Sequence, residues 1–210
     1  MNIRYVRVFN FFDYIQLELY YILFYIVLYL LKMKICVFCS SSNSIAPGFI
    51  DMGKMLGKKI AEKGHTLVYG GATGGLMDAV AEGASGENGE IIGVIPEIII
   101  HSDRLSQLPT QQIVTTDMSE RKKRLKEMAD AFVVLPGGFG TLDEMFDVIA
   151  SATVGEHKKP LICLNYNGFY NRLIQLADEM RTGYFIPKEE KYKPIFVNSV
   201  EECLERIEAI

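Results

Sequence analysis

The chain has 210 residues, of which 49% are hydrophobic and 23% are charged, and its formal net charge is −4. This length and composition are typical of a single globular domain with a sizeable core. The negative charge, and the lack of a basic patch with interleaved aromatic residues, argue against a nucleic-acid partner.

Residues 1–32 differ from the rest of the chain, since they are rich in Tyr, Phe, Ile and Leu. The uncharged run from Leu19 to Leu31 has 13 residues, whereas a membrane span needs about 20, and no signal-peptide cleavage site follows it. Three alternatives stay open: a weak membrane anchor, a helix packed on the domain, or an upstream extension that is not normally made. We favour the third, because Met33 directly precedes a predicted strand, and we expect the domain to span residues 33–210.

From Met33 onward, strand and helix patterns alternate. Strands are predicted over residues 34–40, 66–69, 90–95, 112–114, 131–135, 160–165 and 195–197, and helices over 49–63, 76–84, 117–129, 141–154, 169–181 and from 199. Continuous apolar strands separated by helices predict an α/β fold, a doubly wound parallel sheet of the Rossmann type with helices on both faces. Ligands bind such sheets at the carboxyl ends of the strands.

Two of the loops at this edge are rich in serine or glycine. The hydroxyls and amides of Ser40 to Ser42, with Ser41 as the candidate, suit a phosphate or base, or else they cap the following helix. Residues 70–75 contain four glycines, more than one turn needs, which favours close approach of a ligand at Gly70 and Gly71. Neither loop carries a dinucleotide-binding or Walker A pattern, which argues against an NAD-dependent oxidoreductase and against ATP hydrolysis.

The third loop, residues 136–144, reads Pro-Gly-Gly-Phe-Gly-Thr-Leu-Asp-Glu between a predicted strand and a helix. Glycines there expose backbone amides, and the start of a helix attracts anions. The candidate ligand-binding residues are Gly137, Gly138, Phe139, Gly140 and Thr141. Glu144 lies one turn into the helix, beside the predicted anion site, and suits a sugar attached to a phosphate. An alternative is a capping box, in which Thr141 caps the helix and Glu144 reaches back to its amide.

The charged helix from Asp117 opens with a second capping pattern, Asp117 with Glu120, followed by four basic residues. Such a run is usually a solvated face. However, this helix leads through a strand into the third loop, so its start lies at the same rim of a parallel sheet. Arg121 and Lys122 are therefore candidates to bind a phosphate or ribose.

The cysteines and histidines give no sign of a metal site. Four cysteines form no disulfide framework at this length, which favours reduced thiols in a cytoplasmic protein. Cys36 and Cys39 lie three apart in a strand and so face opposite sides of it. His65, His101 and His157 lack metal-ligand spacing.

Residues 33–210 resemble the Lonely Guy family, whose members were formerly described as lysine decarboxylases. The resemblance runs through ordered motifs: ICVFCSSS at 35–42, LVYGGA at 67–72, IGVIP at 92–96, MSERK at 118–122, PGGFGTLDE at 136–144 and GEHKKP at 155–160. It implies a cytosolic homodimer or higher homo-oligomer that needs no cofactor. It also implies hydrolysis of the N-glycosidic bond of nucleoside 5'-monophosphates, including cytokinin riboside monophosphates and AMP, to free base and ribose 5-phosphate.

The resemblance assigns roles to the candidate residues. Arg121 and Glu144 would be the catalytic pair, Lys122 and residues 138–141 would hold phosphate and ribose, and Asp103 would contact the substrate. We expect Glu144 to stabilise positive charge on the sugar or to orient the attacking water. Arg121 would keep Glu144 ionised, and Asp103 is one candidate to protonate the leaving base. The alternative is a non-catalytic nucleotide-binding module of the same fold, which would not need Arg121 and Glu144 together.

Overall fold

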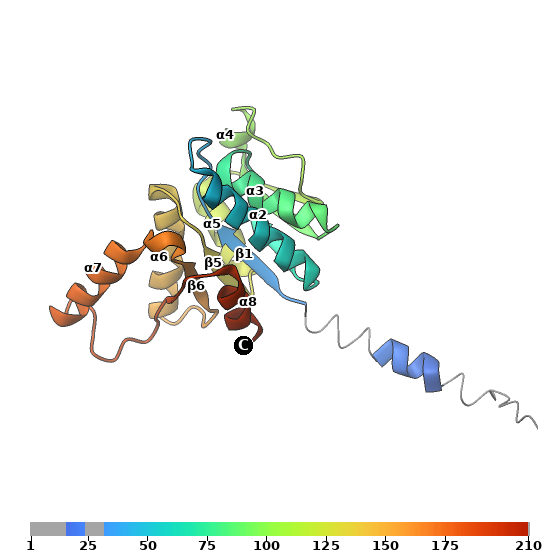
Figure 1. Cartoon of the computed structure of the whole chain (residues 1–210). Helices are drawn as coiled ribbons and strands as arrows, with labels where there is room; N and C mark the ends of the chain where they lie inside the picture. Colours follow the sequence, from blue (N-terminus) through green and yellow to red (C-terminus); the bar gives the residue numbers. More distant parts are fainter. Residues whose placement is uncertain (1–15, 24–31, 210) are drawn as a thin grey trace, which may run out of the picture. The chain divides into compact units, whose positions relative to one another are not determined.

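The computed structural model describes residues 16–23 and 32–209, and residues 16–23 form a short helix. The chain divides into two units, residues 1–32 and 33–210, and Figure 1 labels helices and strands of the second. The three alternatives for residues 1–32 concern a segment that lies mostly outside the described residues. In the described ranges, no helix combines the length and the hydropathy that crossing a membrane requires.

The second unit alternates strands with helices. Its strands are β1 (Lys34–Phe38), β2 (Thr66–Tyr69), β3 (Ile91–Pro96), β4 (Gln111–Thr115), β5 (Ala131–Val134), β6 (Leu161–Leu164) and β7 (Ile195–Val197). Its helices are α2 (Pro47–Glu62), α3 (Gly75–Gly86), α4 (Glu97–Ile100), α5 (Met118–Met128), α6 (Phe139–Thr153), the 3-10 turn η1 (Tyr166–Gly168), α7 (Asn171–Thr182) and α8 (Val200–Glu208).

The strands form one sheet in the order β4-β3-β2-β1-β5-β6-β7, and every neighbouring pair is parallel. The chain winds outward from β1 to one edge and then returns to β5 and winds to the other, so the predicted doubly wound α/β fold is confirmed. The winding direction reverses between β1 and β5. In such sheets the crevice beyond the carboxyl ends of these two strands is the usual ligand site.

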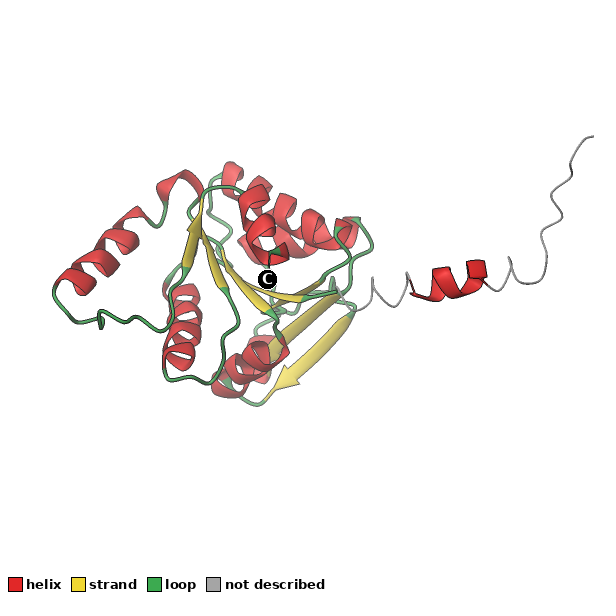
Figure 2. Ribbon diagram, turned by 90° about the horizontal axis from the view of Figure 1, so that it is seen from below, coloured by secondary structure: helices red, strands yellow, loops and turns green. Residues whose placement is uncertain are grey.

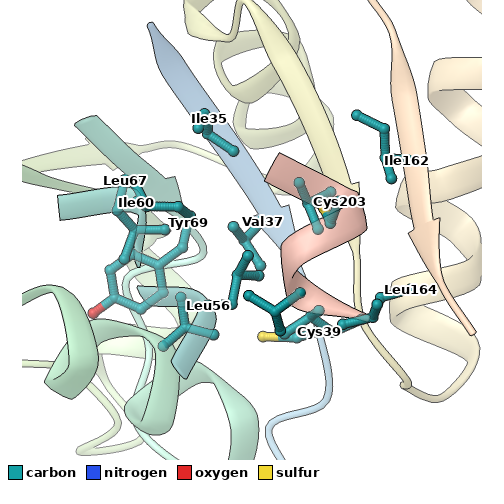
Figure 3. Close-up of a cluster of buried hydrophobic side chains, with 14 of the residues drawn as sticks. Ile35, Val37, Cys39, Leu56, Ile60, Leu67, Tyr69, Ile162, Leu164 and Cys203 are labelled. Atoms are coloured by element: carbon teal, nitrogen blue, oxygen red, sulfur yellow. The ribbon is translucent and has the colours of Figure 1, made fainter. Parts of the chain in front are cut away.

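Helices cover both faces of the sheet (Figure 2). On one face, Ile35, Val37 and Cys39 pack with apolar residues of α2, α3 and α8 (Figure 3). On the other face, Cys36 and Phe38 pack with residues of α5 and α6. The thiols of Cys36 and Cys39 therefore face opposite sides of β1, as their spacing predicts. The two apolar layers fix the strand ends and hence the loops that follow them.

Three predicted helix starts are wrong by two residues, those of α2, α6 and α7, and the first two matter for the site. Helix α6 begins at Phe139 with Gly138 as its N-cap residue, so Thr141 lies inside the first turn and does not cap the helix. Helix α2 begins at Pro47, with Ala46 as its N-cap residue, rather than at the predicted residue 49, because proline is preorganised for the first helical position. The connection predicted as irregular over residues 98–108 begins with the single-turn helix α4.

Candidate active site

A cavity of about 340 Å³ opens at the carboxyl edge of the sheet. Its lining residues come from the loop after β1 (Cys39, Ser40, Ser41, Ser42), the loop after β2 and the start of α3 (Gly70, Ala72, Met77), the end of β3 with the segment behind it (Pro96, Ile99, Arg104), the start of α5 (Met118, Arg121), and the start of α6 (Gly138, Gly140, Thr141, Glu144). The cavity thus occupies the switch point between β1 and β5 and extends toward β3. It brings together residues from all three loops that the sequence singles out.

Arg121 and Glu144 form a buried ion pair in the wall of this cavity. Arg121 Nη1 donates to Glu144 Oε1 over 2.6 Å, and the two residues are only 5% and 6% exposed. Arg121 Nε also donates to the Val94 carbonyl at 3.0 Å, which ties the guanidinium to the end of β3. Glu144 therefore bonds to Arg121 and not to the Thr141 amide, so the capping-box alternative for Glu144 is wrong.

The start of α5 is fixed by its own cap. Asp117 accepts from the Glu120 amide at 2.8 Å, as predicted. The Glu120 carboxylate accepts from the Thr116 amide at 2.9 Å, one residue before the N-cap amide that a strict capping box would use. This cap places Arg121 in the first turns of α5, where its side chain reaches the cavity.

Burial raises the pKa of Glu144 above its ordinary value, and the neighbouring Arg121 opposes that rise. The sequence predicts that Arg121 keeps Glu144 ionised, and the charge and hydrogen bond of Arg121 do act in that direction. Desolvation is the larger effect, so the net shift is upward. A carboxylate with this environment is suited to proton or charge chemistry in a confined site.

The first turn of α6 leaves room for a ligand. A Cβ atom built on Gly138 or on Gly140 would meet no atom within 4 Å, and neither glycine has a positive φ. Neither the backbone conformation nor the packing of the protein therefore requires glycine at positions 138 and 140. Both glycines line the cavity. The first amides of a helix also lack acceptors within the helix. Together these features fit an anion held against the start of α6.

The glycines of residues 70–75 serve the protein itself. A Cβ on Gly70 would collide with the Arg121 guanidinium. Cβ atoms on Gly74 and Gly75 would collide with the carbonyls of Ser41 and Ser42, which belong to the loop after β1 (residues 39–46), here called the serine loop. Gly71 has a φ of +68° and packs against Gly93. The glycines were predicted to admit a ligand, but at positions 71, 74 and 75 the close neighbour is protein, and only Gly70 lines the cavity.

The serine loop contributes its backbone and its hydroxyls to the cavity without capping α2. The Ser42 amide donates to Ser40 Oγ at 3.2 Å, and the Ser44 amide donates to Ser42 Oγ at 3.3 Å. The N-cap residue of α2 is Ala46, which makes no side-chain cap. The helix-capping alternative for the serines is therefore wrong, while Ser41 lines the cavity as predicted.

Five of the predicted site residues do not line the cavity: Asp103, Lys122, Gly137, Phe139 and Gly71. Phe139 is 93% exposed, and a Cβ on Gly137 would collide with the Thr141 side chain. Lys122 Nζ lies 3.0 Å from a carboxylate oxygen of Asp143. Asp103 is exposed, lies in the turn that follows α4 and has a φ of +54°.

The cavity also contains residues that sequence reasoning misses. The clearest is Arg104, which follows Asp103 and has no motif around it to mark it. The apolar lining residues also give no sign of a ligand site in the sequence, because apolar residues near strand ends are normally part of the core. They are Met77, Pro96, Ile99 and Met118. No lysine lines the cavity, and the described ranges contain no group of three or more His, Cys, Asp or Glu side chains placed to hold a metal ion.

Comparison with known proteins gives a consistent result. A family model described as "Possible lysine decarboxylase" matches residues 77–207. A protein of Oryza sativa subsp. japonica named "Probable cytokinin riboside 5'-monophosphate phosphoribohydrolase" is 35% identical over 176 residues, covering 84% of this chain and 70% of its own. An Arabidopsis thaliana protein named "Cytokinin riboside 5'-monophosphate phosphoribohydrolase" is 33% identical over 175 residues, covering 83% of this chain and 81% of its own.

Solved structures share the fold at lower identity. The molybdenum cofactor binding protein of the phototrophic bacterium Rippkaea orientalis has a TM-score of 0.64 at 24% identity and covers 85% of this chain and 96% of its own. The molybdenum cofactor carrier protein of Chlamydomonas reinhardtii has a TM-score of 0.65 at 22% identity, covering 85% of this chain and 97% of its own. At this identity the likeness concerns the fold alone.

Proposed function

Because the chain belongs to the Lonely Guy family of cytokinin riboside 5'-monophosphate phosphoribohydrolases, we propose that it hydrolyses the N-glycosidic bond of nucleoside 5'-monophosphates. The products are a free base and ribose 5-phosphate. Cytokinin riboside monophosphates, for which the relatives are named, and AMP belong to this substrate class. The observation that carries the proposal is the buried Arg121–Glu144 pair beside the open start of α6 in one cavity.

The phosphate binds at the first turn of α6, where Gly138 and Gly140 leave space and the amides of residues 139–141 lack helical acceptors. This contact is remote from the bond that breaks, and its binding energy holds the sugar in position. Thr141 lines the same end of the cavity, and its hydroxyl adds a polar contact. The phosphate end of the substrate thus lies between β1 and β5.

Glu144 acts on the ribose. Cleavage of a ribosyl bond develops oxocarbenium character at the anomeric carbon, and the ionised Glu144 carboxylate stabilises that charge or orients the attacking water. Arg121 holds the carboxylate through the 2.6 Å hydrogen bond and favours its ionised form. Because the pair is buried, its charges act with little screening by water.

The test is release of free base from AMP and from isopentenyladenosine monophosphate, followed by chromatography, for the wild type and for Glu144→Gln. We expect the variant to lose at least about 100-fold in kcat/KM. Its thermal midpoint should stay close to that of the wild type, because an amide oxygen still accepts from Arg121. Glu205→Gln, on the exposed side of α8, is the matched control and should keep full activity.

Two results would contradict the proposal. Equal turnover by the wild type and Glu144→Gln would remove Glu144 from the chemistry. Bound nucleotide with no base release from the wild type would instead favour the non-catalytic nucleotide-binding module.

The proposal also covers the active part of the chain, its cellular compartment and its oligomeric state. Residues 33–210 carry the activity, so a protein begun at Met33 should match the full chain in kcat/KM. The four cysteines are free and buried, which supports a reducing cytoplasm. Following the family resemblance, the active form is a homodimer or higher homo-oligomer, and light scattering after size-exclusion chromatography measures its mass.

A further inference from the structure

The motif GEHKKP at residues 155–160 lies away from the cavity. It directly precedes β6, so it lies at the amino edge of the parallel sheet, whereas the cavity opens at the carboxyl edge. Residues 155–160, all of which the structure describes, are not among the residues that line the cavity. A motif at this edge acts on the site only through elements that reach from one edge of the sheet to the other. Helices α5 and α6 are such elements.

Lys159 caps the end of α5. Its Nζ donates to the Lys126 carbonyl at 2.7 Å and to the Glu127 carbonyl at 3.2 Å. These carbonyls belong to the last turn of α5 and lack donors within the helix, and a cation there also interacts favourably with the negative end of the helix dipole. The Lys159 carbonyl accepts from Tyr192 Oη at 2.7 Å. Both the side chain and the backbone of Lys159 are therefore fixed.

His157 holds the end of α6. Its Nε2 lies 3.1 Å from Oγ of Ser151, a buried residue in the last turn of that helix. Ser151 Oγ donates its one proton to the Val148 carbonyl at 3.2 Å, so it accepts from His157 Nε2. The imidazole also packs against Phe132 of β5 and against Tyr192, with ring centroids 5.8 and 5.9 Å away. One short segment thus holds the last turns of both helices.

Helices α5 and α6 are also joined to each other along their length. Their ion pairs are Arg121–Glu144, Lys122–Asp143 at 3.0 Å and Lys126–Asp147 at 2.8 Å. The last two pairs are four residues apart on each helix, so the helices lie side by side and parallel. With a rise of 1.5 Å per residue, the Lys126 carbonyl lies about 8 Å along α5 from Arg121, and Ser151 lies about 10 Å along α6 from Glu144. A rigid helix carries a shift at one end to the other over such lengths.

We propose that Lys159 is a positioning residue of the reaction. Together with His157, it holds the last turns of α5 and α6 at a fixed separation, and so sets the distance between Arg121 and Glu144 in the first turns of the same helices. This inference rests on the proposed function and adds to it a residue that never touches the substrate. It gives residues 155–160 a role in the chemistry although they lie at the opposite edge of the sheet.

The distance between Arg121 and Glu144 affects a measurable quantity. Burial and the charge of Asp143 raise the pKa of Glu144, whereas Arg121 and Lys122 lower it. When Lys159 no longer holds α5, Arg121 moves away from Glu144 and lowers the pKa of this carboxyl less, so the pKa rises. A purely structural contact, when lost, lowers the thermal midpoint and leaves the pKa of Glu144 in the folded protein unchanged.

The experiment compares Lys159→Met, which keeps an unbranched side chain and removes the charge and both hydrogen bonds, with Lys159→Arg, which still donates to two carbonyls. Lys158→Met is the matched control, since Lys158 is the exposed neighbour. Base release from isopentenyladenosine monophosphate is measured as a function of pH. For Lys159→Met we expect kcat to fall about 10-fold, KM to change by less than about twofold, and the acid limb to move to higher pH. Lys159→Arg and the control should keep the wild-type values.

NMR separates this inference from the proposed function. In protein with ¹³C-labelled glutamate and no substrate, the pKa of Glu144 is read from the carboxyl signal that Glu144→Gln lacks. A higher pKa in Lys159→Met, restored in Lys159→Arg, supports the positioning role even if no nucleotide is cleaved, in which case only the proposed function fails. An unchanged pKa in Lys159→Met, or an equal rise in Lys159→Arg, overturns the inference.

A second variant decides the outcome if Lys159→Met does not fold. His157→Phe keeps an aromatic ring beside Phe132 and Tyr192 and loses only the hydrogen bond to Ser151. The same rise in the pKa of Glu144 and the same fall in kcat are expected, each smaller than for Lys159→Met because α5 stays capped. If both quantities keep their wild-type values in His157→Phe, the segment only stabilises the fold and the inference is wrong.

Discussion

The two glycine-rich loops of the cavity look alike in sequence and differ in what surrounds them. In the loop after β5, Gly138 and Gly140 face open space, with no atom within 4 Å of a built Cβ. In the loop after β2, Gly70 lies against Arg121, and Gly75 lies against the serine loop. Glycine in the first loop leaves room for a ligand, and glycine in the second lets the protein pack on itself. The surroundings of the missing Cβ, rather than the number of glycines, separate the two roles.

The largest effect should come from Gly70→Ala. The added methyl collides with the Arg121 guanidinium and displaces it from Glu144. Because small displacements of a catalytic group are costly, we expect kcat/KM to fall by roughly 100-fold, measured by base release. A variant that retains wild-type turnover would show that the position of Arg121 does not limit the reaction.

Gly75→Ala should act on stability first. Its φ is +53°, and its Cβ collides with the Ser42 backbone, so the change combines backbone strain with overpacking. We expect a loss of about 2 kcal/mol in the free energy of unfolding, measured by urea denaturation. An unchanged urea midpoint would mean that the serine loop moves aside at little cost. The glycines after β2 would then not be needed for packing, and the difference between the two glycine-rich loops would be smaller.

Gly140→Ala should separate stability from binding. Gly140 is the second residue of α6, and replacing a helical glycine by alanine stabilises by about 0.5–1 kcal/mol. The same methyl occupies space at the proposed phosphate site, so KM should rise while the thermal midpoint rises slightly. If KM is unchanged, the open space at Gly140 is not used by the substrate.

The smallest effect concerns pH. The proposed mechanism requires ionised Glu144, and burial raises the pKa of this carboxyl, so kcat/KM should fall with acidification at a pH above the ordinary glutamate value of about 4.3. Arg121 lowers this pKa, so Gly70→Ala, which displaces Arg121, should move the acid limb further upward. Gly140→Ala should leave the limb in place. If kcat/KM falls only below the ordinary glutamate pKa, the effect of Arg121 on the pKa of Glu144 is larger than that of burial.

The order of strands and helices was predictable because each element has a local signature. Continuous apolar runs such as β5 and helical spacing such as that of α2 depend on residues that are neighbours along the chain. The helix starts were less predictable. Proline at position 47 and the early start of α6 shifted the boundaries by two residues, and the latter shift decided between Thr141 as a cap and Thr141 as part of the cavity wall.

The sequence by itself determined the α/β class, the edge of the sheet that carries the site, and the pairing of Arg121 with Glu144 through the family motifs. Only the tertiary structure decided that Arg104 rather than Asp103 lines the cavity, that Lys122 pairs with Asp143, and which glycines face open space. The reason is distance along the chain. Arg104 and Thr73 are separated by 31 positions, and a contact between such positions leaves no periodicity or local pattern in either segment.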